Sequence, residues 1–144
     1  MSALESEMEM VLKALKIPFQ REYRFKGLCG TRRWRFDFVI GEPLVGLPIA
    51  VEVEGGIWTN GRHSRGGNAF AADCEKYTQA AICAWTVLRY CSHQISTTAP
   101  DELALMWEIY QADLSQHQTD KQPQEKQTRA RDVRQPRRSM HKKV

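Results

Sequence analysis

Three acidic residues of this chain have the types and spacing that a divalent-metal site requires. Asp37 lies in one alternating segment, and Glu52 and Glu54 lie two positions apart in the next. Carboxylate oxygens are hard ligands that suit Mg²⁺ or Mn²⁺. A bound ion of this kind can polarise a phosphoryl oxygen, lower the pKa of a bound water and steady a leaving oxygen. The acids therefore indicate metal-assisted cleavage of a phosphate ester.

These acids would lie side by side if the two segments are neighbouring strands. Strand side chains alternate between faces, so Glu52 and Glu54 share one face, and Asp37 lies on the matching face of the preceding strand. The opposite faces are apolar and hold Trp34, Phe36, Phe38 and Ile40 on the first strand and Ile49, Val51 and Val53 on the second. The register stays open, because a one-residue slip moves a side chain to the other face.

Three adjacent carboxylates repel one another and need a compensating cation. The alternative is that Glu52 and Glu54 are solvated residues on the open face of an antiparallel sheet. Basic residues near the acids favour the functional interpretation, because a phosphate backbone requires such charges. They are Arg21, Arg24, Lys26, Arg32, Arg33 and Arg35.

A polar loop and a helical pair could add further groups. The loop WTNGRHSRGG, residues 58–67, contains Arg62, His63 and Arg65, but it lacks the phosphate-loop pattern, and its histidine could simply be exposed. Asp73 and Lys76 are three apart and share a helix face. Lys76 either points at the acids, where it would hold a water or transition-state charge, or forms a surface ion pair. Three tryptophans are expected to anchor the core or loops rather than to stack on bases: Trp34, Trp58 and Trp85.

The elements that must position these residues follow from hydrophobic periodicity and from Gly and Pro punctuation. We expect helices at 3–16, 69–84 and 101–114 and strands at 21–25, 32–40, 49–55 and 86–90, with a hairpin-type connection at 41–48. The apolar face expected for the middle helix consists of Phe70, Ala71, Cys74, Tyr77, Ala81 and Trp85. The order α-β-β-β-α-β-α predicts an α/β (α+β) domain in which helices flank a mixed sheet of four strands.

Composition and charge divide the chain into two parts. Its 144 residues are 42% hydrophobic and 26% charged, which favours one globular domain and excludes a fibrous or wholly disordered chain. Residues 1–114 hold 12 Lys and Arg against 14 Asp and Glu, whereas residues 115–144 hold 9 against 3. The second part is rich in Gln and has little to bury, so we expect a disordered tail. A basic tail favours polyanions, although it could be only a solubilising extension.

The sequence also bears on the compartment. No apolar run approaches the roughly 18 residues of a membrane helix, and the acidic N-terminus does not have the start of a secretory signal. The cysteines include no C-x-x-C pair and no zinc-finger pattern, which favours reduced thiols. We therefore expect a cytoplasmic protein that has no membrane partner.

In this order, the acids and their strands resemble the PD-(D/E)XK, or restriction-endonuclease-like, nuclease superfamily. Asp37 is followed by Glu52-Val53-Glu54 on consecutive strands, between a first helix and a later helix-strand unit. The longer string RRWRFDF…AVEVEGGIW…GRHSRGG…DCEKY…WTVLR is similar to the small single-domain branch of bacteria and phages, near the very-short-patch repair endonucleases. The resemblance covers about residues 3–92.

The resemblance implies an α-β-β-β-α-β core and a Mg²⁺-dependent phosphodiesterase in which Mn²⁺ substitutes. Asp37 and Glu52 match the metal-binding acids, and the carbonyl of Val53 would add a ligand. Glu54 stands in the place of the motif lysine, which is a departure from the pattern. Lys76, His63 or a second ion held partly by Glu54 could replace that lysine. The chain has no clear Cys/His set for the structural zinc of the repair enzymes, so their mismatch specificity is not implied.

Together these features predict a DNA endonuclease domain at 1–114 in a bacterium or a phage-infected host. Asp37, Glu52 and Glu54 would form the metal site, with His63 and Lys76 near the scissile phosphate. The DNA backbone would lie on the basic tail and on Arg33, Arg35, Arg62 and Arg65. No sequence-reading module is evident, so we expect the enzyme to recognise strand ends, branched structure or nicking sites. It could also act as a homodimer or depend on a protein partner that supplies specificity. The alternatives are a non-catalytic nucleic-acid-binding protein and a ribonuclease on the same fold.

Overall fold

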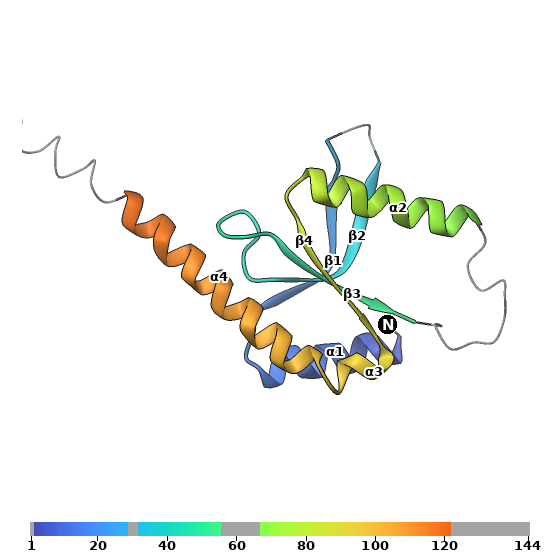
Figure 1. Ribbon diagram of the computed structural model, residues 1–144, viewed down its shortest axis with the longest axis horizontal. Coiled ribbons are helices and arrows are strands. Elements are labelled where there is room, and N and C mark those ends of the chain that lie inside the picture. The colour runs from blue at the N-terminus through green and yellow to red at the C-terminus, as the bar shows by residue number, and fades with distance from the viewer. Residues whose placement is uncertain (1, 29–31, 56–66, 122–144) are drawn as a thin grey trace, which may run out of the picture.

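The structure is a computed structural model that describes residues 2–28, 32–55 and 67–121 (Figure 1). Its elements follow the order α1 (Ala3–Ala14), β1 (Phe19–Lys26), β2 (Arg33–Ile40), β3 (Ile49–Glu54), α2 (Gly67–Ile82), β4 (Thr86–Cys91), α3 (Ser92–Ile95) and α4 (Ala99–Lys121). The expected mixed α/β fold with helices on a four-stranded sheet is confirmed. The short helix α3 is the one described element that the sequence patterns did not predict.

All three predicted helices differ from their expected bounds, and helix α1 ends at Ala14, two residues earlier than predicted. Helix α2 begins and ends two residues earlier than predicted, and Ala84 takes a left-handed conformation after it, with φ 61°. Helix α4 continues to Lys121, so residues 115–121, which were expected to be part of a disordered tail, are helical. These residues contain no Pro or Gly, so nothing in them interrupts a helix. The remainder of the expected tail, residues 122–144, lies outside the described residues. No helix in the described ranges is long and apolar enough to cross a membrane.

The sheet has the strand order β1-β2-β3-β4. Strands β1, β2 and β3 pair antiparallel, whereas β3 and β4 pair parallel, which makes the sheet mixed as expected. The register places Phe38 opposite Val51 and Glu52 opposite Arg89. Because β3 and β4 run the same way, Glu54 and Arg89 come together near the carboxyl ends of both strands.

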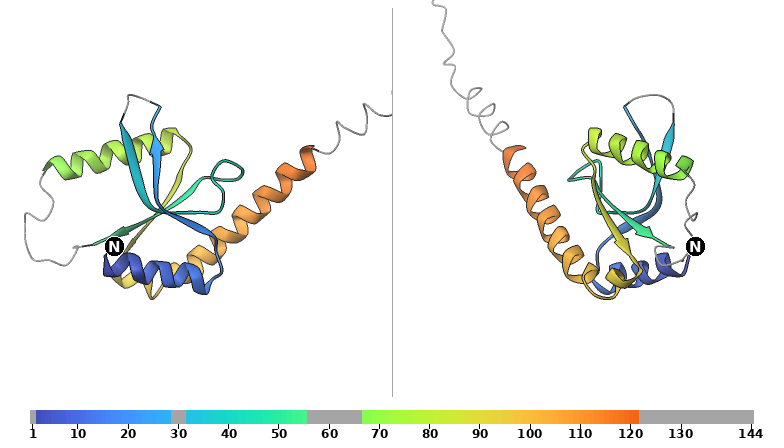
Figure 2. Two further views of the ribbon diagram at one scale, coloured as in Figure 1. Left: turned by 180° about the vertical axis from the view of Figure 1, so that it is seen from behind. Right: turned by 45° about the vertical axis from the view of Figure 1, so that its right-hand side comes forward.

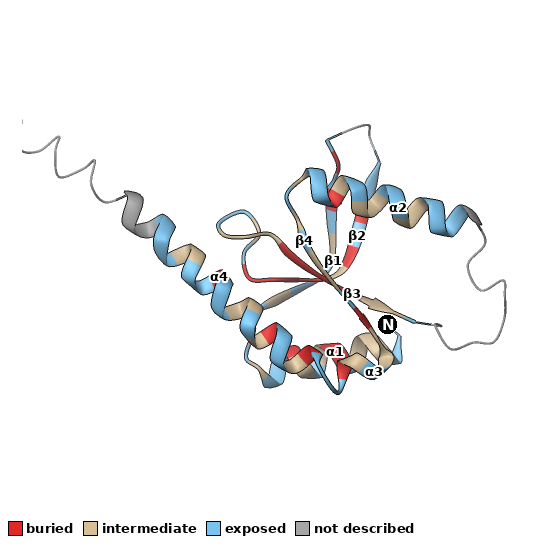
Figure 3. Cartoon of the chain, in the orientation of Figure 1, coloured by how far each residue is buried: buried red, intermediate tan, exposed pale blue. Residues whose placement is uncertain are grey.

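Two hydrophobic clusters lie on the two faces of the sheet (Figure 2). Helices α1, α3 and α4 cover the first, which contains Met8, Leu12, Ile17, Phe38, Ile40, Ile49, Val51, Tyr90, Ile95, Ala99, Leu103 and Tyr110. Helix α2 covers the second, which contains Phe25, Trp34, Phe36, Val39, Ala50 and Ala80, with Tyr23, Trp85 and Val87 against it. Trp34 and Trp85 are core anchors, as expected, whereas Trp58 lies outside the described residues. In Figure 3 the buried residues gather where the helices meet the sheet, and the far half of α4 is mostly exposed.

The β1–β2 hairpin turns its apolar side from one cluster to the other. Strand alternation would place Phe36 and Phe38 on the same face, yet Phe38 packs with α1 and Phe36 packs with α2. The change occurs opposite Glu22, whose φ of 54° is left-handed and which lies between the paired residues Arg21 and Tyr23. Figure 2 shows the hairpin bending from α1 toward α2. Asp37 therefore lies at the bend.

The apolar face predicted for α2 is correct only for Tyr77, which is half-buried, and Trp85, which packs against the second cluster. Phe70 is 69% exposed, and Ala71, Cys74 and Ala81 are exposed too. Instead Ala80 is buried, and a more polar set on the same side of the helix is half-buried: Asp73, Lys76 and Tyr77. The reason is that the part of α2 from Ala69 to Tyr77 covers acidic residues of the sheet rather than apolar ones.

Candidate functional site

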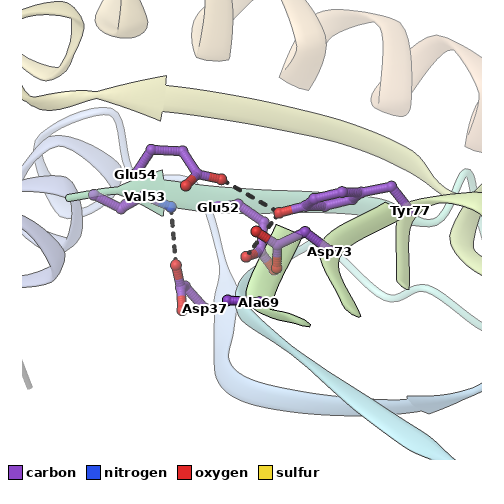
Figure 4. Close-up of a pocket in the computed structure, with 7 residues that line it drawn as sticks. All are labelled: Asp37, Glu52, Val53, Glu54, Ala69, Asp73 and Tyr77. Carbon is purple, nitrogen blue, oxygen red and sulfur yellow. Dashed lines mark hydrogen bonds between the residues drawn. The ribbon is translucent and has the colours of Figure 1, made fainter. Parts of the chain in front are cut away.

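A polar pocket between the sheet and α2 contains the three acids that the sequence placed on one face (Figure 4). Strands β2 and β3 contribute Asp37, Glu52, Val53 and Glu54, and α2 contributes Ala69, Asp73 and Tyr77. Strands β2 and β3 pair antiparallel with Phe38 opposite Val51. The next residue along each strand from this pair is Asp37 on β2 and Glu52 on β3, so the register brings the acids together. The pocket is thus formed by side chains on one face of β2 and β3 and by the polar side of α2.

Asp37 is half-buried at the bend of the hairpin and accepts a hydrogen bond from the backbone N–H of Val53, with an N···O distance of 2.9 Å. Burial raises the pKa of its carboxyl, and the charges of Glu5 and Glu22 act in the same direction. The Val53 hydrogen bond and the charge of Lys76 oppose this rise. Asp37 is therefore an acid that a nearby cation would stabilise.

Glu52 is buried, with 7% of its surface exposed, and its Oε1 accepts a hydrogen bond from Lys76 Nζ at 2.7 Å. Burial raises its pKa to about 6, although Lys76 acts against the shift. The negative charges of Asp37 and Glu54 raise it further. Lys76 thus points at the acids, and its side chain is only 13% exposed, which is inconsistent with a simple surface pair.

Glu54 belongs to a network that the sequence did not reveal. Arg89 donates from Nε and Nη2 to Glu54 Oε1, at 2.9 and 2.6 Å, and its guanidinium lies 4.2 Å from the centroid of the Tyr77 ring. The Tyr77 hydroxyl lies 3.3 Å from Glu54 Oε1 and 3.5 Å from Glu52 Oε2. Burial raises the pKa of Tyr77, so the hydroxyl stays a donor.

The one sequence signal for Tyr77 is its spacing from Asp73, four positions along the helix, which places both on one side. Arg89 could not be assigned, because its position beside Glu52 depends on the parallel pairing of β3 with β4.

The charges of the pocket suit a divalent cation. Among the described residues, the carboxylates of Asp37, Glu52, Glu54 and Asp73 line the pocket, while Lys76 pairs with Glu52 and Arg89 pairs with Glu54. Carboxylates gathered this closely are unfavourable unless cations compensate their charges. Mg²⁺ commonly takes one or two protein carboxylates and keeps several waters. The oxygen donors of Asp37 and Glu52, which line one pocket, therefore fit this ion. Within residues 2–28, 32–55 and 67–121, no three His, Cys, Asp or Glu side chains form a ready-made metal cluster.

The other predicted site residues fall in different places. Arg62, His63 and Arg65 lie outside the described residues. Arg33 and Arg35 lie on the exposed side of the β1–β2 hairpin and do not line the acidic pocket. The three described cysteines, Cys74, Cys83 and Cys91, are free thiols.

Comparisons of the chain with protein-family models, with curated proteins and with solved structures found no match. The chemistry of the pocket accordingly rests on its own residues, and the likeness to restriction-endonuclease-like nucleases stays a prediction.

Proposed function

We propose that the chain is a metal-dependent endonuclease that hydrolyses phosphodiester bonds in DNA on a restriction-endonuclease-like core. The observation that carries this proposal is the pocket lined by Asp37 and the buried Glu52, whose Oε1 accepts a hydrogen bond from Lys76 Nζ at 2.7 Å. Buried acids of raised pKa beside a partly buried lysine are typical of catalytic sites rather than of solvated sheet faces.

Asp37 and Glu52 would hold Mg²⁺ or Mn²⁺, and the carbonyl of Val53 would complete the protein ligands. When bound, the ion supplies a Lewis acid that polarises the phosphoryl oxygen and acidifies a water. The Val53 N–H donates to Oδ2 of Asp37, and Lys76 Nζ donates to Oε1 of Glu52. Each carboxylate is therefore oriented by one hydrogen-bond donor. This fixed arrangement is what a preorganised site needs.

Lys76 supplies the positive charge that Glu54 cannot supply. Glu54 stands where the resemblance expects a lysine, and its own charge is offset by Arg89. Lys76 approaches Glu52 from α2 instead, where its ammonium can orient the attacking water or stabilise charge on the phosphate. His63 remains a second candidate for this role, in a segment outside the described residues.

The described helices and strands form one sheet domain and include no separate base-reading module. We therefore propose that the enzyme recognises strand ends, branched structure or a nicking site rather than a base sequence.

The test is cleavage of supercoiled plasmid and of branched DNA with Mg²⁺ or Mn²⁺. Asp37→Asn and Glu52→Gln should each lower nicking by about 100-fold or more, because each removes a ligand charge. Glu75→Gln is the matched control, since Glu75 is an exposed acid on α2 that pairs with Arg32. Cleavage that persists in both pocket variants would place the chemistry elsewhere. RNA cut in preference to DNA would favour the ribonuclease alternative.

A further inference from the structure

The exposed side of the β1–β2 hairpin carries four cations in two directly opposed pairs. Arg24 faces Arg35 across the strands, and Lys26 faces Arg33. All four side chains are exposed. We refer to Arg24, Lys26, Arg33 and Arg35 as the basic ladder.

Like charges placed directly opposite each other destabilise a strand pair. Strand β3 pairs with β2 only at Phe38–Ile40, so the outer hairpin that carries the ladder is a two-stranded ribbon in which each cation directly faces another cation. The ladder is therefore an arrangement that folding alone does not favour.

The charges of the ladder are also poorly compensated. Arg35 contacts Glu22, but Arg24, Lys26 and Arg33 form no ion pair within the described part of the chain. Neighbouring basic residues differ in this respect. Arg21 bridges Glu5 and Glu9, and Arg32 pairs with Glu75. The sequence alone thus does not distinguish the basic residues that form ion pairs from those that form none within the described part of the chain, whereas the structure does.

A shallow hollow opens between three of these guanidinium groups. It is lined by Arg24, Trp34, Arg33 and Arg35. Trp34 is 7% exposed, and its buried indole Nε1–H has no hydrogen-bond partner among the residues that the structure describes. Guanidinium groups bind phosphate oxygens in a bidentate fashion, so three of them around one hollow form a phosphate-binding arrangement.

We propose that the basic ladder binds the phosphate backbone of a nucleic-acid strand that extends beyond the acidic pocket. This deepens the proposed function and rests on it for the identity of the pocket. Arg33 lies four residues from Asp37 along β2, or about 13 Å in an extended strand. Arg35 contacts Glu22, and Glu22 is close enough to act on Asp37, so ladder and pocket are neighbours. Phosphate contacts carry no base information, so the binding is independent of sequence.

The test is the salt dependence of binding of the full chain to a labelled oligonucleotide, single-stranded and duplex, in EDTA. Arg24→Gln/Arg33→Gln should bind about tenfold more weakly, and the slope of log K against log salt should become shallower by about 2. Lys13→Gln/Lys16→Gln is the control, because it removes the same charge from exposed positions at the end of α1. An equal effect of both double variants would overturn the proposal.

Two further measurements separate this proposal from its alternatives. With Mg²⁺, the ladder variant should raise KM and leave kcat unchanged, whereas Asp37→Asn should lower kcat and leave the salt slope unchanged. If the wild type does not cleave DNA but the ladder variant still shows the shallower salt slope, the nuclease proposal is rejected and the proposal for the basic ladder stands. A ladder variant that binds like the wild type would reject the ladder, whatever the cleavage result.

Thermal unfolding controls for misfolding. The ladder variant should melt at the same temperature as the wild type or higher, because the substitutions remove repulsion. Binding to vesicles of anionic lipid that the ladder variant loses, with oligonucleotide binding unchanged, would assign the arginines to a membrane surface and overturn the proposal.

Discussion

At the scale of single residues, Lys76 controls the acidity of the pocket. Burial raises the pKa of Glu52, and Lys76 limits that rise. Lys76→Met should therefore raise the pKa of Glu52 further and move the acid limb of the pH–rate profile upward by about one pH unit, with a lower kcat. Lys76→Arg keeps the positive charge and should partly restore the position of the acid limb and kcat. The measurement is kcat/KM against pH for the three proteins. An acid limb that stays in place in Lys76→Met would contradict the assigned contact.

The residues of the pocket could be predicted only in part. Alternation along two strands predicted that Asp37 lies beside Glu52 and Glu54 if the strands are neighbours, but it left the register open, and helical spacing allowed Lys76 to face them. Arg89 depends on a parallel pairing between strands that are 31 residues or more apart in sequence, and no local pattern encodes such a register. The polar face of α2 was misassigned because apolar periodicity fails where a helix covers charged groups.

At the scale of elements, the connection between β2 and β3 depends on its packing against α4. The Tyr110 hydroxyl accepts a hydrogen bond from the N–H of Glu42 at 2.7 Å and lies 3.3 Å from its carbonyl oxygen. Gly41 has a φ of 67°, and a Cβ there would lie 2.5 Å from the Tyr110 ring. Gly41→Ala should thus cost about 2 kcal/mol or more of the free energy of unfolding.

The measurement for this change is urea unfolding, with Gly46→Ala as the control. A Cβ at Gly46 meets the same ring at 2.7 Å without a left-handed backbone, so that variant should lose less stability. Nicking per folded molecule should not change in either variant, because the connection lies at the opposite end of β3 from Glu54. Equal stability of Gly41→Ala and the wild type would show that the loop yields without strain.

Most elements could be predicted from local patterns, but their bends and ends could not. All four strands were predicted, although burial alternates only in β1 and the outer part of β2, and Ile49–Glu52 of β3 are buried without alternation. The change of face opposite Glu22 depends on one left-handed residue that is not Gly, for which the sequence carries no warning. Helix α4 runs past its apolar part because polar residues without Gly or Pro can extend a helix that packing has already started.

At the scale of the whole molecule, the acidic pocket lowers stability when no metal is bound. The folded pKa of Glu52 is about 6 against an ordinary 4.5, so the native state binds its proton more tightly than the unfolded state does. The resulting stabilisation is complete below pH 4.5 and is lost as pH rises through 6, a change of at most about 2 kcal/mol. The raised pKa of Asp37 acts in the same direction.

Mg²⁺ should reverse this loss at neutral pH. An ion present at about 100 times its Kd adds about 2.7 kcal/mol to the free energy of unfolding. Urea unfolding at several pH values, in EDTA or Mg²⁺, should therefore show the pH-dependent loss and the metal effect in the wild type and in Glu75→Gln. Glu52→Gln should lack the metal effect and keep only the smaller pH-dependent loss that comes from Asp37. The same gain from Mg²⁺ in Glu52→Gln would place the ion outside the pocket.

The bend opposite Glu22 has a mechanical consequence. Asp37 lies at the pivot about which the outer part of the hairpin turns, and the cations lie farther out along the same two strands. Because Phe25, Trp34 and Phe36 of the outer part pack with Ala80 of α2, the bend holds those cations at a fixed place relative to the carboxylate of Asp37.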